Sequence, residues 1–126
     1  MMMNKTLNRT PIASCDAEGN VRYTAEYLRE ALADWMKMPE SPKQYQELLL
    51  LASNSLALQE ESLAKDVYEF VLRKLAFRCN REPAYRVFAE QALAGLSTLS
   101  TSSNEYIWET SSQIYSDYRA ILEQKH

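Results

Sequence analysis

The scarcity of glycine is the feature that most restricts what this chain can fold into. Only two glycines, Gly19 and Gly95, and four prolines occur among its 126 residues. All-β folds with many tight turns depend on these residue types, which makes such a fold improbable on composition. Two glycines at this spacing also cannot build the Gly-rich loops that hold nucleotide phosphates. The composition therefore favours long secondary-structure elements that are joined by few tight turns.

The spacing of apolar residues agrees with this expectation. From Thr24 onward, apolar side chains recur with the 3.6-residue period of an amphipathic helix. Local signals for helix starts are Thr24, the pair Ser41 and Gln44, and the pair Ser102 and Glu105. We expect an all-α, single-domain bundle of about five helices or stacked helical hairpins, with helices near 24–38, 42–58, 62–79, 83–96 and 105–123.

Length and composition indicate one folded domain. Hydrophobic residues make up 46% and charged residues 25%, which predicts a folded rather than a disordered chain. Residues 1–22 are expected to form a poorly defined tail or a short hairpin, and residues 23–126 the helical domain. The longest strongly apolar run, 48–52, is far shorter than the roughly 20 residues that span a bilayer. We expect a cytoplasmic protein without a signal peptide or a membrane partner.

Small residues predict where helices approach one another. Ala89, Ala92 and Gly95 share one face of the fourth predicted helix, so a neighbouring helix is expected to lie close to them. Cys79 falls on an apolar helical face and is expected to be a buried thiol rather than a nucleophile, because no histidine lies near it.

Helical hairpins of similar length prompt a search for internal repeats. One stretch has the large–small spacing of a tetratricopeptide unit, at Leu48, Leu51, Ala52, Ala64, Tyr68 and Val71. A second copy should begin about 34 residues later, but the nearest similar residues follow after 37 and the pattern then fails. Any packed helical hairpin needs such alternation, so the chain is assigned to no repeat family.

Catalytic and metal chemistry have little support. The single histidine is His126, the last residue, which removes most acid–base and metal-binding chemistry. Glu123 and His126 have the spacing of one di-iron ligand pair, but such a site needs two copies. Glu60 and Glu61 lie at a predicted helix start, where acidic side chains favour the helix dipole. We expect no catalytic residue, no metal and no cofactor, and an enzyme is the weakest hypothesis.

Basic residues concentrate in one short segment, although the net charge is -3. The segment contains five basic residues and one acid, Glu82; the basic residues are Arg73, Lys74, Arg78, Arg81 and Arg86. They either pair with nearby glutamates or recognise an acidic protein or the phosphates of a nucleic acid. Phe77 and Tyr85 interleave with them, but we assign both rings to apolar faces, which disfavours base stacking.

The last predicted helix is rich in aromatic residues. Trp108, Tyr115 and Arg119 form a second stripe beside its core face. These residue types concentrate binding energy at protein interfaces. The stripe either covers the edge of the bundle or binds a partner, including a second copy of the chain.

These features lead to one main functional hypothesis and one alternative. The main hypothesis is a non-enzymatic protein-interaction module, such as a bacterial-type adaptor, chaperone, immunity protein or regulator. Its partner would contact the stripe of the last helix, the basic segment, or both. The alternative is a nucleic-acid-associated regulator that uses the basic segment.

Overall fold

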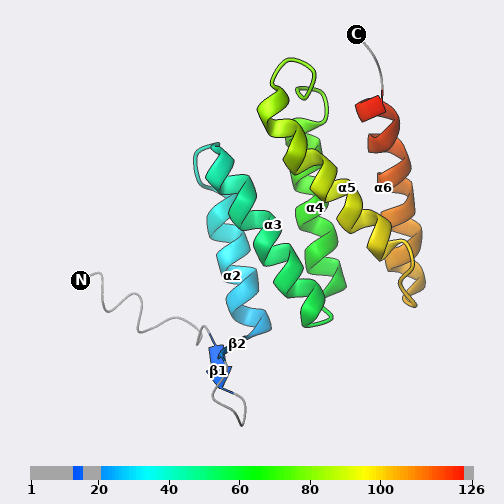
Figure 1. Ribbon diagram of the computed structural model, residues 1–126. Helices are drawn as coiled ribbons and strands as arrows, with labels where there is room; N and C mark the ends of the chain where they lie inside the picture. Colours follow the sequence, from blue (N-terminus) through cyan, green and yellow to red (C-terminus); the bar gives the residue numbers. More distant parts are fainter. Residues whose placement is uncertain (1–12, 16–20, 124–126) are drawn as a thin grey trace.

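The computed structural model describes residues 13–15 and 21–123, and confirms the all-α bundle (Figure 1). Its elements are β1 (Ala13–Cys15), β2 (Val21–Tyr23), α2 (Ala25–Met36), α3 (Pro42–Ala57), α4 (Glu61–Leu75), the 3₁₀ helix η1 (Pro83–Tyr85), α5 (Arg86–Leu99) and α6 (Glu105–Glu123). β1 and β2 pair antiparallel, with Ala13 opposite Tyr23 and Cys15 opposite Val21. The predicted tail over 1–12, the turn over 16–20 and the chain end from 124 lie outside the described residues.

The first two helices begin at their predicted caps. The Thr24 hydroxyl accepts a hydrogen bond from the backbone N–H of Tyr27 at 3.1 Å. The Ser41 hydroxyl accepts one from the backbone N–H of Gln44, also at 3.1 Å. Both caps satisfy a backbone donor that the helix itself leaves without a partner.

The side chain of Gln44 does not complete the predicted capping box. Its amide nitrogen instead donates to the carbonyl oxygens of Trp35 at 2.9 Å and Met38 at 3.1 Å. Trp35 lies in the last turn of α2 and Met38 lies two residues beyond its end, so Gln44 ties the end of α2 to the start of α3. Because α2 ends at Met36, Met38 is exposed and does not extend the apolar face as expected.

The predicted break between α3 and α4 is confirmed, although neither glycine nor proline marks it. Gln59 adopts a left-handed conformation with φ of 62°. The N–H of Glu60 donates to the carbonyl of Ser55 at 2.8 Å, and that of Gln59 to the carbonyl of Leu56 at 2.9 Å. This bond pair is the Schellman ending, which reverses the chain direction.

Two helices end at positions other than those expected. α4 stops at Leu75 rather than near Cys79, and residues 76–80 form turns. Cys79 is nevertheless buried as predicted, and its thiol donates to the carbonyl of Leu75 at 3.1 Å. α5 continues to Leu99 through residues expected to be loop, because burial of the Leu99 side chain holds the last turn in place.

The predicted cap of α6 is wrong by two residues. Asn104, not Ser102, accepts the hydrogen bond, from the backbone N–H of Ile107 at 3.2 Å. The Ser102 hydroxyl donates instead to the carboxylate of Glu61 at 2.8 Å. Glu61 lies at the start of α4, so the loop between α5 and α6 is anchored to a distant helix.

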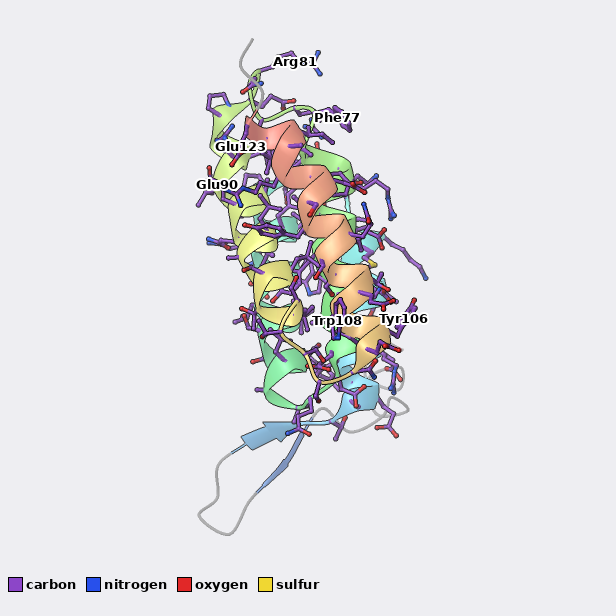
Figure 2. All side chains as sticks on the ribbon, turned by 90° about the vertical axis from the view of Figure 1, so that its right-hand side faces the viewer. Phe77, Arg81, Glu90, Tyr106, Trp108 and Glu123 are labelled. Atoms are coloured by element: carbon purple, nitrogen blue, oxygen red, sulfur yellow. The ribbon has the colours of Figure 1, made fainter. Side chains whose placement is uncertain are left out.

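The helices form two layers (Figures 1 and 2). α3 and α5 make up one layer, and α2, α4 and α6 the other. Each helix packs mainly on the helices that adjoin it in sequence, and α4 also packs on α6. The core consists of fully or nearly fully buried apolar side chains, among them Leu28, Leu48, Val67, Val71, Leu72, Leu75, Leu96, Ile107 and Leu122.

Gly95 allows α5 to lie directly over an aromatic ring of α4. An ideal Cβ atom at Gly95 would lie 2.2 Å from Cζ of Tyr68, far inside the normal contact distance. Ala89 and Ala92 are fully buried. The predicted close approach at Gly95 is therefore confirmed, and the approaching group is a side chain.

Candidate functional site

The basic segment lies at the end of the bundle where α4 passes into α5 (Figure 1). Arg73 and Lys74 belong to the last turn of α4, Arg78 and Arg81 to the turns that follow, and Arg86 begins α5. Whether each of these basic side chains is available to a partner depends on the hydrogen bonds and ion pairs that it forms within the chain.

Arg78 is the centre of an ion-pair network. Its guanidinium donates to both carboxylate oxygens of Glu40, at 2.6 and 2.9 Å, and to both of Glu82, at 2.8 and 3.0 Å. It also lies 5.3 Å from the ring centroid of Tyr85. The hydroxyl of Tyr45 donates to Glu40 as well. The network joins the loop before α3 to the turn after α4.

These contacts also set the protonation of the network. The hydrogen bonds from Arg78 and then from Tyr45 hold the pKa of Glu40 below its ordinary value. Arg78 lowers the pKa of Glu82 in the same way. Burial, and then the bond to Glu40, raises the pKa of Tyr45. Both carboxylates are thus charged at neutral pH and neutralise Arg78 within the chain.

Arg86 also bonds within the chain. It pairs with Glu90 on the next turn of α5 at 2.9 Å. A second guanidinium nitrogen donates to the backbone carbonyl of Leu122 at 2.9 Å. That carbonyl belongs to the last turn of α6, whose carbonyls have no partner within the helix. Arg86 therefore fastens the end of α6 to the start of α5.

The remaining basic residues, Arg73, Lys74 and Arg81, lie within four residues of Phe77 in the sequence, and the Lys74 ammonium lies 5.6 Å from the ring centroid of Phe70. Arg73, Lys74 and Arg81 are exposed and form no ion pair with any residue between 24 and 123. The Phe77 side chain, one turn after Arg73, is 70% exposed. Figure 2 shows Phe77 and Arg81 at the same end of the bundle. We call these four residues the Phe77 patch.

The exposure of Phe77 corrects the assignment of this ring to an apolar helical face. That assignment assumed a helix reaching Cys79, in which residue 77 would continue the periodic pattern. Because α4 ends at Leu75, Phe77 lies in a turn, and none of the described helices covers its side chain. Tyr85 is half-buried, and its ring packs edge-on against Tyr45 at 5.6 Å between centroids.

The stripe on α6 is only partly exposed. Trp108 is 41% exposed, whereas Tyr115 packs half-buried against the core. Arg119 pairs with Glu123 at 2.8 Å and lies 5.8 Å from the ring centroid of Tyr115. Tyr106, which the stripe did not include, is 63% exposed. Figure 2 shows Tyr106 and Trp108 on opposite sides of α6.

The structure brings the basic segment near the Arg119 end of the predicted stripe on α6, but far from Trp108 at its other end. Arg86 contacts Leu122 near the end of α6, while Trp108 lies in its first turn. Leu122 lies 14 positions after Trp108 in α6, which is about 21 Å along the helix axis. Figure 2 accordingly shows Phe77 and Arg81 at one end of the bundle and Tyr106 and Trp108 toward the other.

Across 13–15 and 21–123, no group of three or more His, Cys, Asp and Glu side chains is placed to hold a metal ion. Among the described helices, none has the length and apolar character that a membrane span requires. Burial raises the pKa of the Cys79 thiol, which disfavours the reactive thiolate.

Comparison with protein-family models, with curated protein sequences and with solved structures gives no match for this chain.

Proposed function

We propose that this chain is a non-enzymatic protein-interaction module, and that its Phe77 patch binds an acidic and partly apolar surface of a partner protein. The observation that supports this proposal is the 70% exposed side chain of Phe77, together with three exposed cations that lie within four residues of it in the sequence and form no ion pair within residues 24–123. Burial of a fully exposed Phe is worth roughly 1.5–3 kcal/mol, so one ring can anchor an interface. The cations add charge complementarity, which steers association and excludes basic partners.

The charge distribution favours a protein over a nucleic acid. The chain carries a net charge of -3, and Arg78 and Arg86 are engaged by carboxylates of the chain itself. Three exposed cations remain in the patch, which is few for a phosphate backbone that is bound through many contacts. Phe77 also offers the apolar anchor that protein interfaces use.

The test uses the full chain as bait and three matched variants. Phe77→Ala removes the ring, and Arg73→Glu with Arg81→Glu reverses two charges. Val87→Ala is the control, because Val87 is also an exposed apolar residue but belongs to α5. A captured protein is identified by mass spectrometry, purified and titrated by calorimetry. We expect about tenfold or greater weakening for the first two variants and no change for the control. If all variants bind the partner equally well, the Phe77 patch is not its binding site.

The nucleic-acid alternative is tested with the same proteins. Labelled single- and double-stranded oligonucleotides are titrated at low and at physiological salt. Binding that weakens steeply with salt, and that disappears in Arg73→Glu with Arg81→Glu, would replace the protein partner by a nucleic acid. We expect no such binding.

Self-association through α6 is a separate question, which light scattering answers. The informative variant combines Tyr106→Ala with Trp108→Ala, because both side chains are exposed. Tyr115→Ala is unsuitable, since Tyr115 packs against the core and its loss would also lower stability. A dimer that this variant dissociates would assign the interface to α6, and a monomeric wild type would exclude a homodimer.

A further inference from the structure

We propose that the groove between α3 and α5 is a second binding site, and that it takes a short extended peptide segment with a lysine or arginine side chain. The groove lies in the α3–α5 layer, opens to the surface and has a volume of about 700 Å³. It shares no residue with the Phe77 patch, so the two proposals stand independently.

The floor of the groove is a buried tyrosine with an unused hydroxyl. Tyr68 of α4 lines the groove and is only 4% exposed. Its ring is held under Gly95 of α5, where no Cβ atom blocks it. Its hydroxyl oxygen is accessible to solvent and makes no hydrogen bond with any residue between 24 and 123. Burial raises the pKa of Tyr68, so the hydroxyl is a donor at neutral pH and can bind a carbonyl oxygen.

The walls carry groups that match a peptide main chain. Gln46 of α3 and Gln91 of α5 line the groove from its two sides. Each carboxamide has an N–H donor group and a carbonyl acceptor, and a peptide unit has the same two kinds of group. The lining along α3 runs from Gln46 to Ser53, about 10 Å of helix, which equals about three residues of extended chain. The groove thus has the size and polarity for a segment rather than for a folded surface.

The charge of the residues that line the groove favours a basic side chain in the bound peptide segment. Glu47 is the only charged residue among those that line the groove, and it forms no ion pair within residues 24–123. The exposed Leu50 and Ala94 beside it supply apolar surface. A lysine or arginine stem can pack on these residues while its charge reaches Glu47. An acidic segment would meet an unpaired carboxylate and be rejected.

The experiment selects ligands from a library of random dodecapeptides displayed on phage, with the full chain as target. We expect enrichment of a motif of three or four residues that contains lysine or arginine. Binding of the enriched peptides is then measured by fluorescence anisotropy. Glu47→Lys should shift the enriched residue to aspartate or glutamate and weaken the original peptides at least tenfold. Tyr68→Phe, which removes only the hydroxyl, should weaken them by about fivefold.

Two further variants make the result decisive. Ala94→Trp fills the groove from an exposed position of α5 and should abolish binding, while circular dichroism verifies its fold. Glu109→Lys makes the same charge change as Glu47→Lys at an exposed site of α6 and should leave binding unchanged. The proposal is overturned if no motif is enriched, or if enriched peptides bind Ala94→Trp or Glu47→Lys as tightly as the wild type. Phe77→Ala should not affect these peptides, which separates this test from that of the Phe77 patch.

Discussion

Replacing Gly95 by alanine tests whether the contact with Tyr68 determines the packing of α5. Alanine is the better helix former by about 1 kcal/mol, so helix propensity by itself predicts stabilisation. The new Cβ atom, however, would lie 2.2 Å from Cζ of Tyr68, and 2.4 and 2.6 Å from its two Cε atoms. Carbon atoms pack at about 3.5–4.0 Å, so ring and helix must separate by roughly 1.3 Å. Overpacking of this kind costs about 1–3 kcal/mol, and we expect net destabilisation of up to about 2 kcal/mol.

The assay is urea denaturation followed by circular dichroism, in four proteins that form a double-mutant cycle. In the background of Tyr68→Leu the ring is absent, and Gly95→Ala should there become stabilising by about 0.5–1 kcal/mol. Ser97→Ala is the control for propensity, because Ser97 is exposed on the same helix. It should raise the free energy of unfolding by a few tenths of a kcal/mol.

The sign of the change that Gly95→Ala causes in the free energy of unfolding shows whether the Tyr68 ring constrains α5. If Gly95→Ala stabilises the protein by about 1 kcal/mol in the presence of Tyr68, the ring does not constrain α5 and the reasoning is refuted. An equal effect in both backgrounds would refute it as well, because the coupling between Gly95 and Tyr68 would be zero.

Three other substitutions have defined outcomes. Ser111→Ala should raise the free energy of unfolding by about 1 kcal/mol, because this fully buried hydroxyl has no hydrogen-bond partner within residues 24–123. Arg86→Ala should speed hydrogen exchange in the last turn of α6, because the carbonyl of Leu122 loses its partner. Glu40 and Glu82 have folded pKa values below their unfolded ones, so their stabilisation is present above about pH 4.5 and is lost as pH falls through the folded values. Changing both to glutamine should therefore reduce the loss of stability between about pH 6 and about pH 3, measured by urea denaturation.

Matched controls separate these effects from general changes in helix stability. Ser55 is also fully buried, but its hydroxyl donates to the carbonyl of Leu51 at 2.8 Å, so Ser55→Ala should not stabilise. A stabilisation of equal size in both serine variants would show that helix propensity, not the unpaired hydroxyl, is responsible. Glu109→Gln removes an exposed carboxylate outside the Arg78 network and should leave the acid dependence unchanged.

Signals that act within a few residues were predicted correctly. Thr24 and Ser41 cap α2 and α3 as expected, because a hydroxyl at a helix start needs only the backbone N–H three residues later. The same reasoning failed at Ser102, whose hydroxyl bonds to Glu61, a residue 41 positions away. A local pattern carries no information about a partner that only packing brings near.

The helical class, the approximate helix positions and the close approach at Gly95 could be predicted from the amino-acid sequence, because they follow from periodicity, caps and side-chain size. Which cations are available to a partner depends on how the helices pack. Arg78 is paired by Glu40, 38 residues away, and Phe77 is exposed because α4 ends before it. The groove over Tyr68 likewise requires α3, α4 and α5 together. Ion pairs, exposure and grooves depend on contacts between distant segments, and these contacts exist only once the helices have packed.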